Sequence, residues 1–343
     1  MVRSRHNRLP SVVFWVKGLV SEPSPLPDQR QLVSKVDLRE RMVFKMVDRE
    51  IQYCRQQLRR GYAQTYEQIH PDYGEVLGDV ATTVLTAIAA SDAAYHDVEH
   101  TILVTLTGQE ILRGKQQQDG GVTPEDWFHG LLALLCHDVG YLKGICQGDR
   151  PQYHLYTTGV GSRMVTLTPD QTDASLTPYH VDRGQRFVAE QFRDHPLIDV
   201  KRVQDGIELT RFPVPSGTRY DDTRGYPGLI RAADLLGQLA DPRYLDKLPA
   251  LFQEFAENGT NQQLGYQHPG DLRDGVPGFF WTVVAPYIQD GLKYLCATQG
   301  GKQVVANLYG NIFLVEHELH SKAMQQQAEH LSGMRSPSTA LPA

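Results

Sequence analysis

The sequence has few of the features that mark three common classes of protein. Its four cysteines include no CxxC pair, which argues against a disulfide framework and favours a reduced, cytoplasmic protein. The net charge of −6 gives no basic surface for general nucleic-acid binding. The apolar run at residues 11–20 is interrupted by Lys17 and is too short to cross a bilayer, so we expect no membrane association.

Alternation of apolar and polar residues, the pattern of strands, is also missing outside residues 11–20. Apolar residues instead recur every three or four positions, which predicts helices and an all-α fold. Thr123 is expected to cap one of these helices, with Pro124 at its first position. The expected helices cover residues 34–60, 75–91, 93–114, 124–138, 180–193, 198–210, 227–241, 243–258, 277–298 and 304–327.

We expect these helices to form one domain at residues 34–332. An N-terminal arm with a Pro-rich linker precedes it at 1–33, and a disordered tail follows at 333–343. The amphipathic helix at 34–60 suits either the contact of a homodimer or packing on its own domain. Residues 141–178 are rich in Gly, Thr, Asp and Pro with weak periodicity, which predicts a long lid-like loop.

Histidines and aspartates that could bind a metal occur in three separate stretches. His96 and His100 stand four apart and are expected on one face of the helix at 93–114. His137 and Asp138 end a buried apolar run, where they are costly unless a cation compensates them. Asp234 lies in another apolar helix. Two imidazoles and two carboxylates suit Zn, Mn, Fe or Mg and leave coordination positions for water, as a catalytic site requires.

Each of these features also has a simpler explanation. His96 alone could be a satisfied core or surface histidine, and an H-x3-H pair on a helix is common by chance. An HD pair after an apolar run is more specific. The three features together, in this order and on separate helices, favour a metal site over unrelated histidines.

Four stretches of the sequence also resemble a known family. YHDVEHT, LLALLCHDVGY, PRYLDKLPALFQEFAENGT and VPGFFWTVVAPYIQDGL are similar to motifs of the HD-domain metal-dependent phosphohydrolases. The chain most resembles the catalytic domain of class I cyclic-nucleotide phosphodiesterases, over about residues 85–300. Asp97 stands where that family usually has Asn, and the HPG that normally follows the HD pair is absent.

The resemblance implies a role for each matching residue. His100, His137, Asp138 and Asp234 would bind the first of two divalent ions (Mg, Mn, Zn or Fe), with Asp138 bridging to the second. His96 would be the general acid. Phe279 matches the aromatic residue that clamps the base, whereas Val276 stands where the family has the glutamine that selects purines.

Further residues are candidates with an open alternative. His180 could bind the second metal, hold a water beside it or be a surface histidine. Glu208 could be another metal or outer ligand, or the ion-pair partner of an arginine. Candidates for contacts with the substrate phosphate, by charge alone, are Lys143, Arg150, His154, Arg163 and Arg211.

The expected activity is hydrolysis of a phosphodiester in a small nucleotide-type substrate, cyclic or linear. Two ions would polarise the phosphoryl group and lower the pKa of a bridging water, giving hydroxide that attacks phosphorus. His96 would protonate the leaving oxygen, oriented by Asp97 or another carboxylate. The alternatives are a nucleotidase or deoxynucleotide triphosphate hydrolase on the same fold, a di-iron oxygenase of HD type, and a non-catalytic nucleotide-binding module.

Overall fold

The computed structural model describes residues 35–67 and 69–333, with side chains from Lys45 to His330. The chain divides into two compact units at residues 1–49 and 50–343, and the division lies within α1 (Lys35–Tyr66). In the first unit the described residues form the start of α1. The predicted arm at 1–33 and, apart from Gly333, the predicted tail at 333–343 lie outside the described residues.

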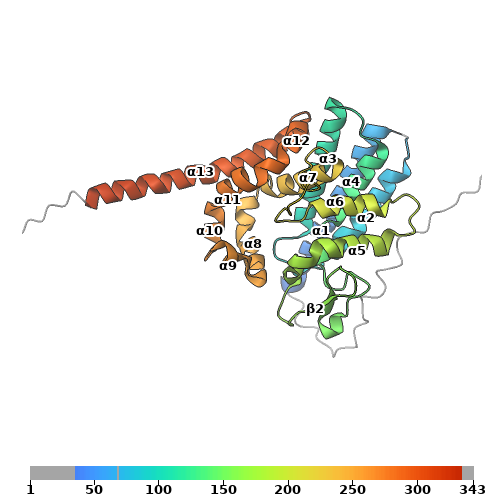
Figure 1. The fold of residues 1–343 in the computed structure, drawn as a ribbon, viewed down its shortest axis with the longest axis horizontal. Coiled ribbons are helices and arrows are strands. Elements are labelled where there is room, and N and C mark those ends of the chain that lie inside the picture. Colours follow the sequence, from blue (N-terminus) through green and yellow to red (C-terminus); the bar gives the residue numbers. More distant parts are fainter. Residues whose placement is uncertain (1–34, 68, 334–343) are drawn as a thin grey trace, which may run out of the picture. The chain divides into compact units, whose positions relative to one another are not determined.

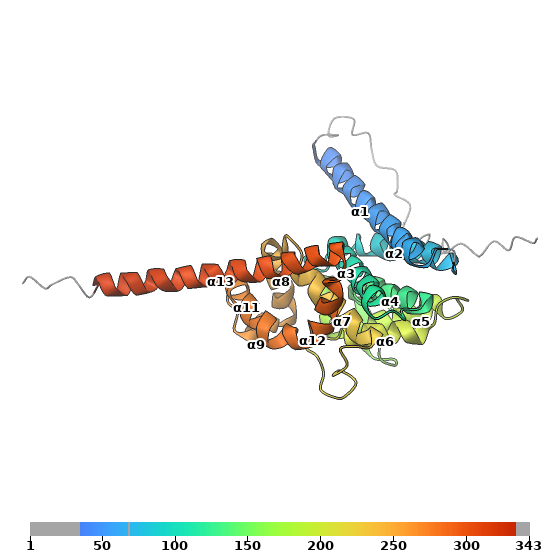
Figure 2. The same cartoon turned by 90° about the horizontal axis from the view of Figure 1, so that it is seen from above.

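The unit that begins at Glu50 confirms the prediction of an all-α fold (Figures 1 and 2). After α1 it contains, in chain order, the following α-helices: α2 (Asp72–Ile88), α3 (Val98–Gln118), α4 (Pro124–Cys136), α5 (His180–Phe192), α6 (Val200–Leu209), α7 (Tyr226–Leu239), α8 (Tyr244–Asn258), α9 (Thr260–Leu264), α10 (Pro269–Asp274), α11 (Val276–Phe279), α12 (Ala285–Leu295) and α13 (Gln299–Gly333). None of the helices in the described part of the chain combines the length and apolar character needed to span a bilayer.

Local signals set the start of the two helices that carry most of the site. Thr123 accepts a hydrogen bond from the backbone of Asp126 and forms a capping box with it, and Pro124 is the first residue of α4, as predicted. The helix α3 begins at Val98, because Asp97 caps it by accepting a hydrogen bond from the backbone of His100. The prediction of one helix over 93–114 is therefore wrong at its start.

The core is built around α3. This helix packs against α7, α4 and α12. At Gly237 in α7 an added Cβ would come within 2.7 Å of the Cα of Val104, so the two backbones approach closely there. This contact holds the middle of α7, with Asp234, beside the first turns of α3.

Residues 141–178, predicted as a lid-like loop, form a small packed substructure. The short strands β1 (Leu155–Thr157) and β2 (Met164–Thr166) pair antiparallel, with Tyr156 opposite Val165. The 3₁₀-helices η3 (Pro151–Tyr153) and η4 (Asp173–Tyr179) lie on either side of the pair in the sequence. Tyr156 of β1 forms a separate apolar cluster with Leu167 and Leu176.

A buried ion pair fastens this substructure to α5. Arg183 donates two hydrogen bonds to Asp149, at 3.0 and 2.9 Å, and others to the carbonyls of Gly140, Leu142 and Thr157. The side chains of Arg183 and Asp149 are 0% and 1% exposed. Two charges this deeply buried are stable only as a fully hydrogen-bonded pair.

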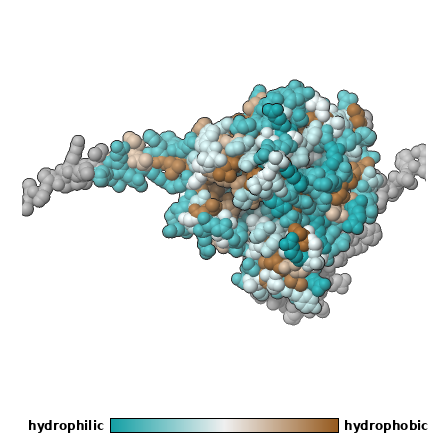
Figure 3. Space-filling model, in the orientation of Figure 1, coloured by the Kyte–Doolittle hydropathy of each residue, from teal (hydrophilic) through white to brown (hydrophobic). Residues whose placement is uncertain are grey.

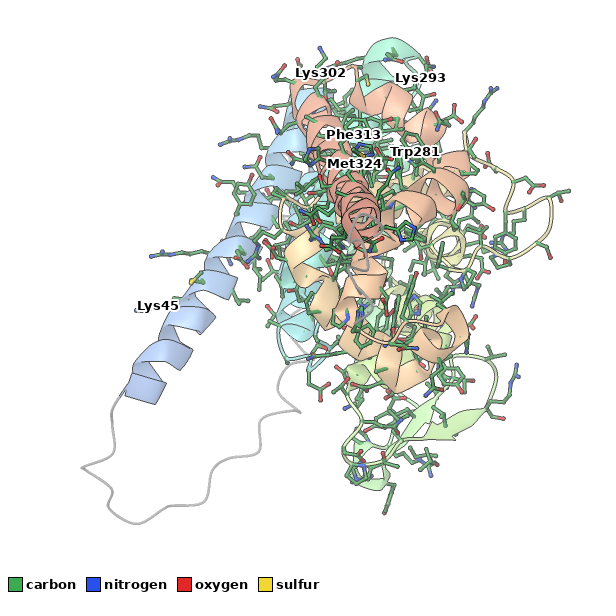
Figure 4. The ribbon with its side chains drawn as sticks, turned by 90° about the vertical axis from the view of Figure 1, so that its left-hand side faces the viewer. Lys45, Trp281, Lys293, Lys302, Phe313 and Met324 are labelled. Carbon is green, nitrogen blue, oxygen red and sulfur yellow. The ribbon has the colours of Figure 1, made fainter. Side chains whose placement is uncertain are left out.

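At the other end of the unit, α13 extends beyond the remaining helices (Figures 1 and 2). Arg273 and Lys322 tie it to α10 through ion pairs with Glu318 and Asp274, both 2.8 Å long. Apolar surface gathers where α13 joins the body (Figure 3), and the exposed Trp281, Phe313 and Met324 are labelled around this helix in Figure 4. This surface belongs to elements other than those that carry the metal-ligand candidates.

Asp149→Ala should lower the free energy of unfolding by about 3–5 kcal/mol, because it leaves the Arg183 charge buried without a partner. Urea denaturation measures the change. Arg219→Ala is the control, since it removes an exposed ion pair with Asp205 and should cost less than about 1 kcal/mol. Equal costs for the two variants would show that the buried pair does not stabilise the fold.

Candidate metal centre

The predicted metal ligands converge from three parts of the chain. His100 comes from the first turn of α3, His137 and Asp138 follow α4, and Asp234 lies in α7. Two overlapping groups have ligand atoms that all lie within 4.8 Å of one another: His96 with His100 and Asp138, and His100 with His137 and Asp234. The described structure thus contains a buried His/Asp cluster that could hold a metal ion.

The turn after α4 brings this cluster against α5. Asp138 is followed by a 3₁₀-helix, η2 (Val139–Tyr141), whose second residue is Gly140. A Cβ added at Gly140 would lie 1.9 Å from the carbonyl oxygen of His180, so only glycine fits. The close approach places His180, the first residue of α5, beside Asp138.

The nitrogen and oxygen atoms that could bind a metal face one another, and two of them have no hydrogen-bond partner in the described part of the chain. Oδ2 of Asp138 lies 3.1 Å from Nε2 of both His100 and His137. Nε2 of His137 also lies 3.5 Å from Oδ1 of Asp234. Among the described residues, Nε2 of His137 and Oδ2 of Asp138 are buried and lack a hydrogen bond. Buried polar atoms rarely stay unsatisfied, and a cation between them would satisfy both.

Backbone carbonyls hold two of the histidines in the form that binds metals. Nδ1 of His137 lies 2.7 Å from the carbonyl oxygen of Leu134, and Nδ1 of His180 lies 2.6 Å from that of Thr177. A carbonyl can only accept, so in both rings Nδ1 carries the proton and a neutral ring presents the lone pair of Nε2. This is the usual arrangement of a metal-binding histidine.

Asp138 faces histidines with both of its oxygens. While Oδ2 faces His100 and His137, Oδ1 lies 4.0 Å from Nε2 of His180. His180 is outside the two compact groups, and burial lowers its pKa. Asp138 therefore faces the compact groups with Oδ2 and His180 with Oδ1.

The pKa values of two residues in the cluster are shifted in the directions expected for groups that share a positive charge. Burial lowers the pKa of His137, but the carboxylates of Asp138 and Asp234 more than offset this and hold it well above its usual value. Burial raises the pKa of Asp138, but His137 and His100 hold it well below its usual value. A bound cation takes the place of the imidazole proton, so metal binding should release protons.

A residue missing from the sequence prediction, Glu254 in α8, holds His96. Its Oε2 lies 2.5 Å from Nδ1 of His96, while Oε1 accepts from the backbone of Tyr95 at 2.7 Å and of His96 at 3.2 Å. The glutamate is 2% exposed, and it raises the pKa of His96 to about 9 against the lowering effect of burial. The available signal was an acidic residue three positions after Leu251, on the buried stripe of an amphipathic helix.

Two further predictions for this region need correction. His96 and His100 do not share a helical face, because His96 lies in the turn before α3. Asp97, which was considered as the group that orients His96, caps α3 instead. The two imidazoles nevertheless lie close, with ring centroids 5.3 Å apart.

Glu208 was a candidate metal ligand, but its carboxylate is occupied elsewhere. It accepts hydrogen bonds from Gln185, Arg211 and Tyr220 at 2.6–3.0 Å, and it is absent from both compact groups. The alternative of an ion pair with an arginine describes its position. Arg211 also pairs with Asp182 at 2.8 Å, which fixes both ends of this network.

The predicted substrate contacts lie in several places, none of them in the compact groups. Lys143 pairs with Asp92 at 3.3 Å and donates to the carbonyl of Gln171. Val276 is buried, whereas Phe279 is half-buried and contacts Phe212 edge-on, with centroids 5.8 Å apart. The remaining candidates, Arg150, His154 and Arg163, are all exposed in the 141–178 substructure.

Comparison with known proteins assigns the chain to a family. The model of a family described as Npun_R2479-like matches residues 44–318, most of the chain, and the protein belongs to this family. No curated protein matches the sequence. The matched region includes every residue of the His/Asp cluster and Glu254.

Asp138→Asn and Asp234→Asn should each weaken binding of Zn²⁺ or Mn²⁺ by at least about 100-fold, because each removes a charged ligand. Calorimetric titration of the metal-free protein measures the affinity. Glu208→Gln is the matched control and should leave it unchanged. If Glu208→Gln weakens binding as much as Asp138→Asn does, the cation lies elsewhere.

Proposed function

We propose that the protein is a metal-dependent phosphohydrolase that cleaves a phosphodiester in a small nucleotide-type substrate. The observation that carries the proposal is the pairing of His96 with the buried Glu254 at the edge of the His/Asp cluster. With Nδ1 held by Glu254, His96 presents Nε2 beside the cluster, and proton transfer to a substrate bound there needs a donor in that position.

The donor set fits divalent cations. Nitrogen from neutral imidazoles and oxygen from carboxylates suits Zn, Mn, Fe or Mg, and the two oxygens of Asp138 face different histidines, which supports two ions rather than one. Such ions, when bound, activate a water and neutralise charge on a phosphoryl group. His100, His137, Asp138 and Asp234 would hold the first ion, and His180 with Asp138 the second.

His96 is the general acid in this proposal. Its Nδ1 is occupied by Glu254, so Nε2 is the nitrogen available to a substrate. The carboxylate of Glu254 stabilises the protonated imidazole and keeps a proton ready for the departing oxygen. Glu254 itself stays charged, because His96 holds its pKa below the usual value although burial raises it.

The proposed substrate has a phosphodiester part and a nucleotide part, and different observations support each. The His/Asp cluster and the acid beside it support the phosphodiester part. The nucleotide part rests on the sequence resemblance at Phe279. Because the buried Val276 cannot hydrogen-bond a purine, a nucleotidase or deoxynucleotide triphosphate hydrolase is the second candidate.

The four free thiols favour a reducing compartment, and we place the activity in the cytoplasm on that ground.

His96→Ala should lower turnover by about 10²–10⁴-fold and leave the metal bound, because it removes the proton donor and no ligand. The assay combines cyclic and linear nucleotides and nucleoside triphosphates with Mg²⁺, Mn²⁺, Zn²⁺ and Fe²⁺, followed by metal analysis of the variant. Glu208→Gln again serves as the control. Parallel loss of metal and activity from His96→Ala would make His96 a ligand. Oxygen-dependent turnover with iron, together with a visible absorption band, would show that the protein is an oxygenase and not a hydrolase.

Turnover of the wild type should fall as pH rises through the pKa of His96, because the acid is then deprotonated. Glu254 raises that pKa to about 9 in the metal-free protein, and bound cations would lower it. Glu254→Gln removes the charge that raises it, so the basic limb of the kcat profile should move to lower pH. A limb that stays in place in Glu254→Gln would contradict the assignment of His96 as the acid.

A further inference from the structure

Three aromatic rings from three segments form a stack beside the cluster. The ring of Tyr141 lies between the imidazoles of His96 and His180, with centroids 4.4 Å away on each side. Its plane is inclined by only 19° to His96 and 20° to His180. Tyr141 is 4% exposed, so little of this arrangement is open to solvent.

The position of Tyr141 is fixed by the same turn that positions Asp138. Its backbone N–H donates to the carbonyl of Asp138 at 3.0 Å in η2. The preceding Gly140 packs on the backbone of His180 with no space for a Cβ. The backbone of Tyr141 therefore cannot shift relative to Asp138 without opening the contact between η2 and α5, and the ring is held between the two imidazoles.

We propose that Tyr141 is a positioning residue for His96, an inference that rests on the proposed role of His96 as the acid. Glu254 fixes where Nδ1 points, but a hydrogen bond to one atom leaves the ring free to rotate about it. Stacking on Tyr141 fixes the plane of the ring. The two contacts together leave one orientation for Nε2, and a misplacement of about 1 Å costs on the order of 10²-fold in rate.

The ring of Tyr141 also keeps His96 and His180 apart, so the two histidines have different roles. Zinc–nitrogen bonds are about 2.0–2.1 Å long, so two imidazoles on one ion have nitrogens within roughly 4 Å of each other. His96 and His180 each stack at 4.4 Å on opposite faces of the ring between them. The stack therefore prevents them from sharing an ion, so His180 faces Oδ1 of Asp138 while His96 lies beside His100.

The test compares Tyr141→Phe, which keeps a flat ring, with Tyr141→Leu, which does not. Each metal-loaded variant is assayed on a nucleoside phosphodiester, whose alkoxide leaving group needs a proton, and on bis(p-nitrophenyl) phosphate, whose leaving group does not. Tyr141→Leu should lower kcat on the first substrate by about 10–100-fold and on the second by less than about 3-fold, with KM and metal content unchanged. Tyr141→Phe should behave as the wild type.

Tyr73→Leu is the matched control for loss of a buried tyrosine stack. Tyr73 stacks on Phe128 at 4.3 Å and 13°, away from the His/Asp cluster, and is 7% exposed. This variant should lose stability but keep the ratio of the two rates. An equal fall of both rates in Tyr141→Leu, with metal lost, would show that Tyr141 is structural only and would overturn the inference.

A second readout does not depend on activity. In the zinc-loaded protein the Nδ1 proton between His96 and Glu254 should give a far-downfield proton NMR signal, identified by its loss in Glu254→Gln. The signal should persist in Tyr141→Phe and disappear or broaden in Tyr141→Leu. An unchanged signal in Tyr141→Leu would contradict the positioning role. This readout decides the role of Tyr141 even if the wild type hydrolyses neither substrate, a result that would overturn the proposed function alone.

Discussion

The rest of the structure depends on one constraint, the burial of the Asp138 carboxylate. This carboxylate is shielded from water and faces three imidazoles. Asp138 is 6% exposed, and no hydrogen bond from the described residues satisfies its Oδ2. A buried charge in that position is unfavourable unless a positive charge shares the site. Asp138 and Asp234 raise the pKa of His137, so a proton on that ring supplies positive charge in the metal-free protein, and a divalent cation would supply more of it.

Elements around the site are arranged to keep this carboxylate in place. The close contact of α3 with α7 at Gly237 brings Asp234 to His100, and Gly140 brings α5 to η2. Carbonyls of Leu134 and Thr177 fix the protonation of two histidines. The buried pair of Arg183 and Asp149 holds the 141–178 segment on α5, so the predicted lid-like loop is packed against the helices.

The sequence predicted those parts of the structure that depend on local patterns. Apolar periodicity identified the longer helices but missed the short α9 and α10. The Thr123 cap and Pro124 marked the start of α4, and the HD pair after a buried run indicated the cluster. Glu254 and Tyr141 were missed as partners of His96, because they act through contacts between segments far apart in the chain. Asp97 was misassigned for the converse reason, since its cap on α3 is a local interaction that the expected longer helix obscured.

Anomalous X-ray diffraction from crystals grown with Zn²⁺ or Mn²⁺ tests the central claim most directly, because it locates the metal without reference to any activity. The account predicts a strong anomalous peak within coordination distance of His100, His137, Asp138 and Asp234, with a weaker one between Asp138 and His180. A well-ordered cluster with no anomalous peak, or a metal held only by residues elsewhere, would contradict it.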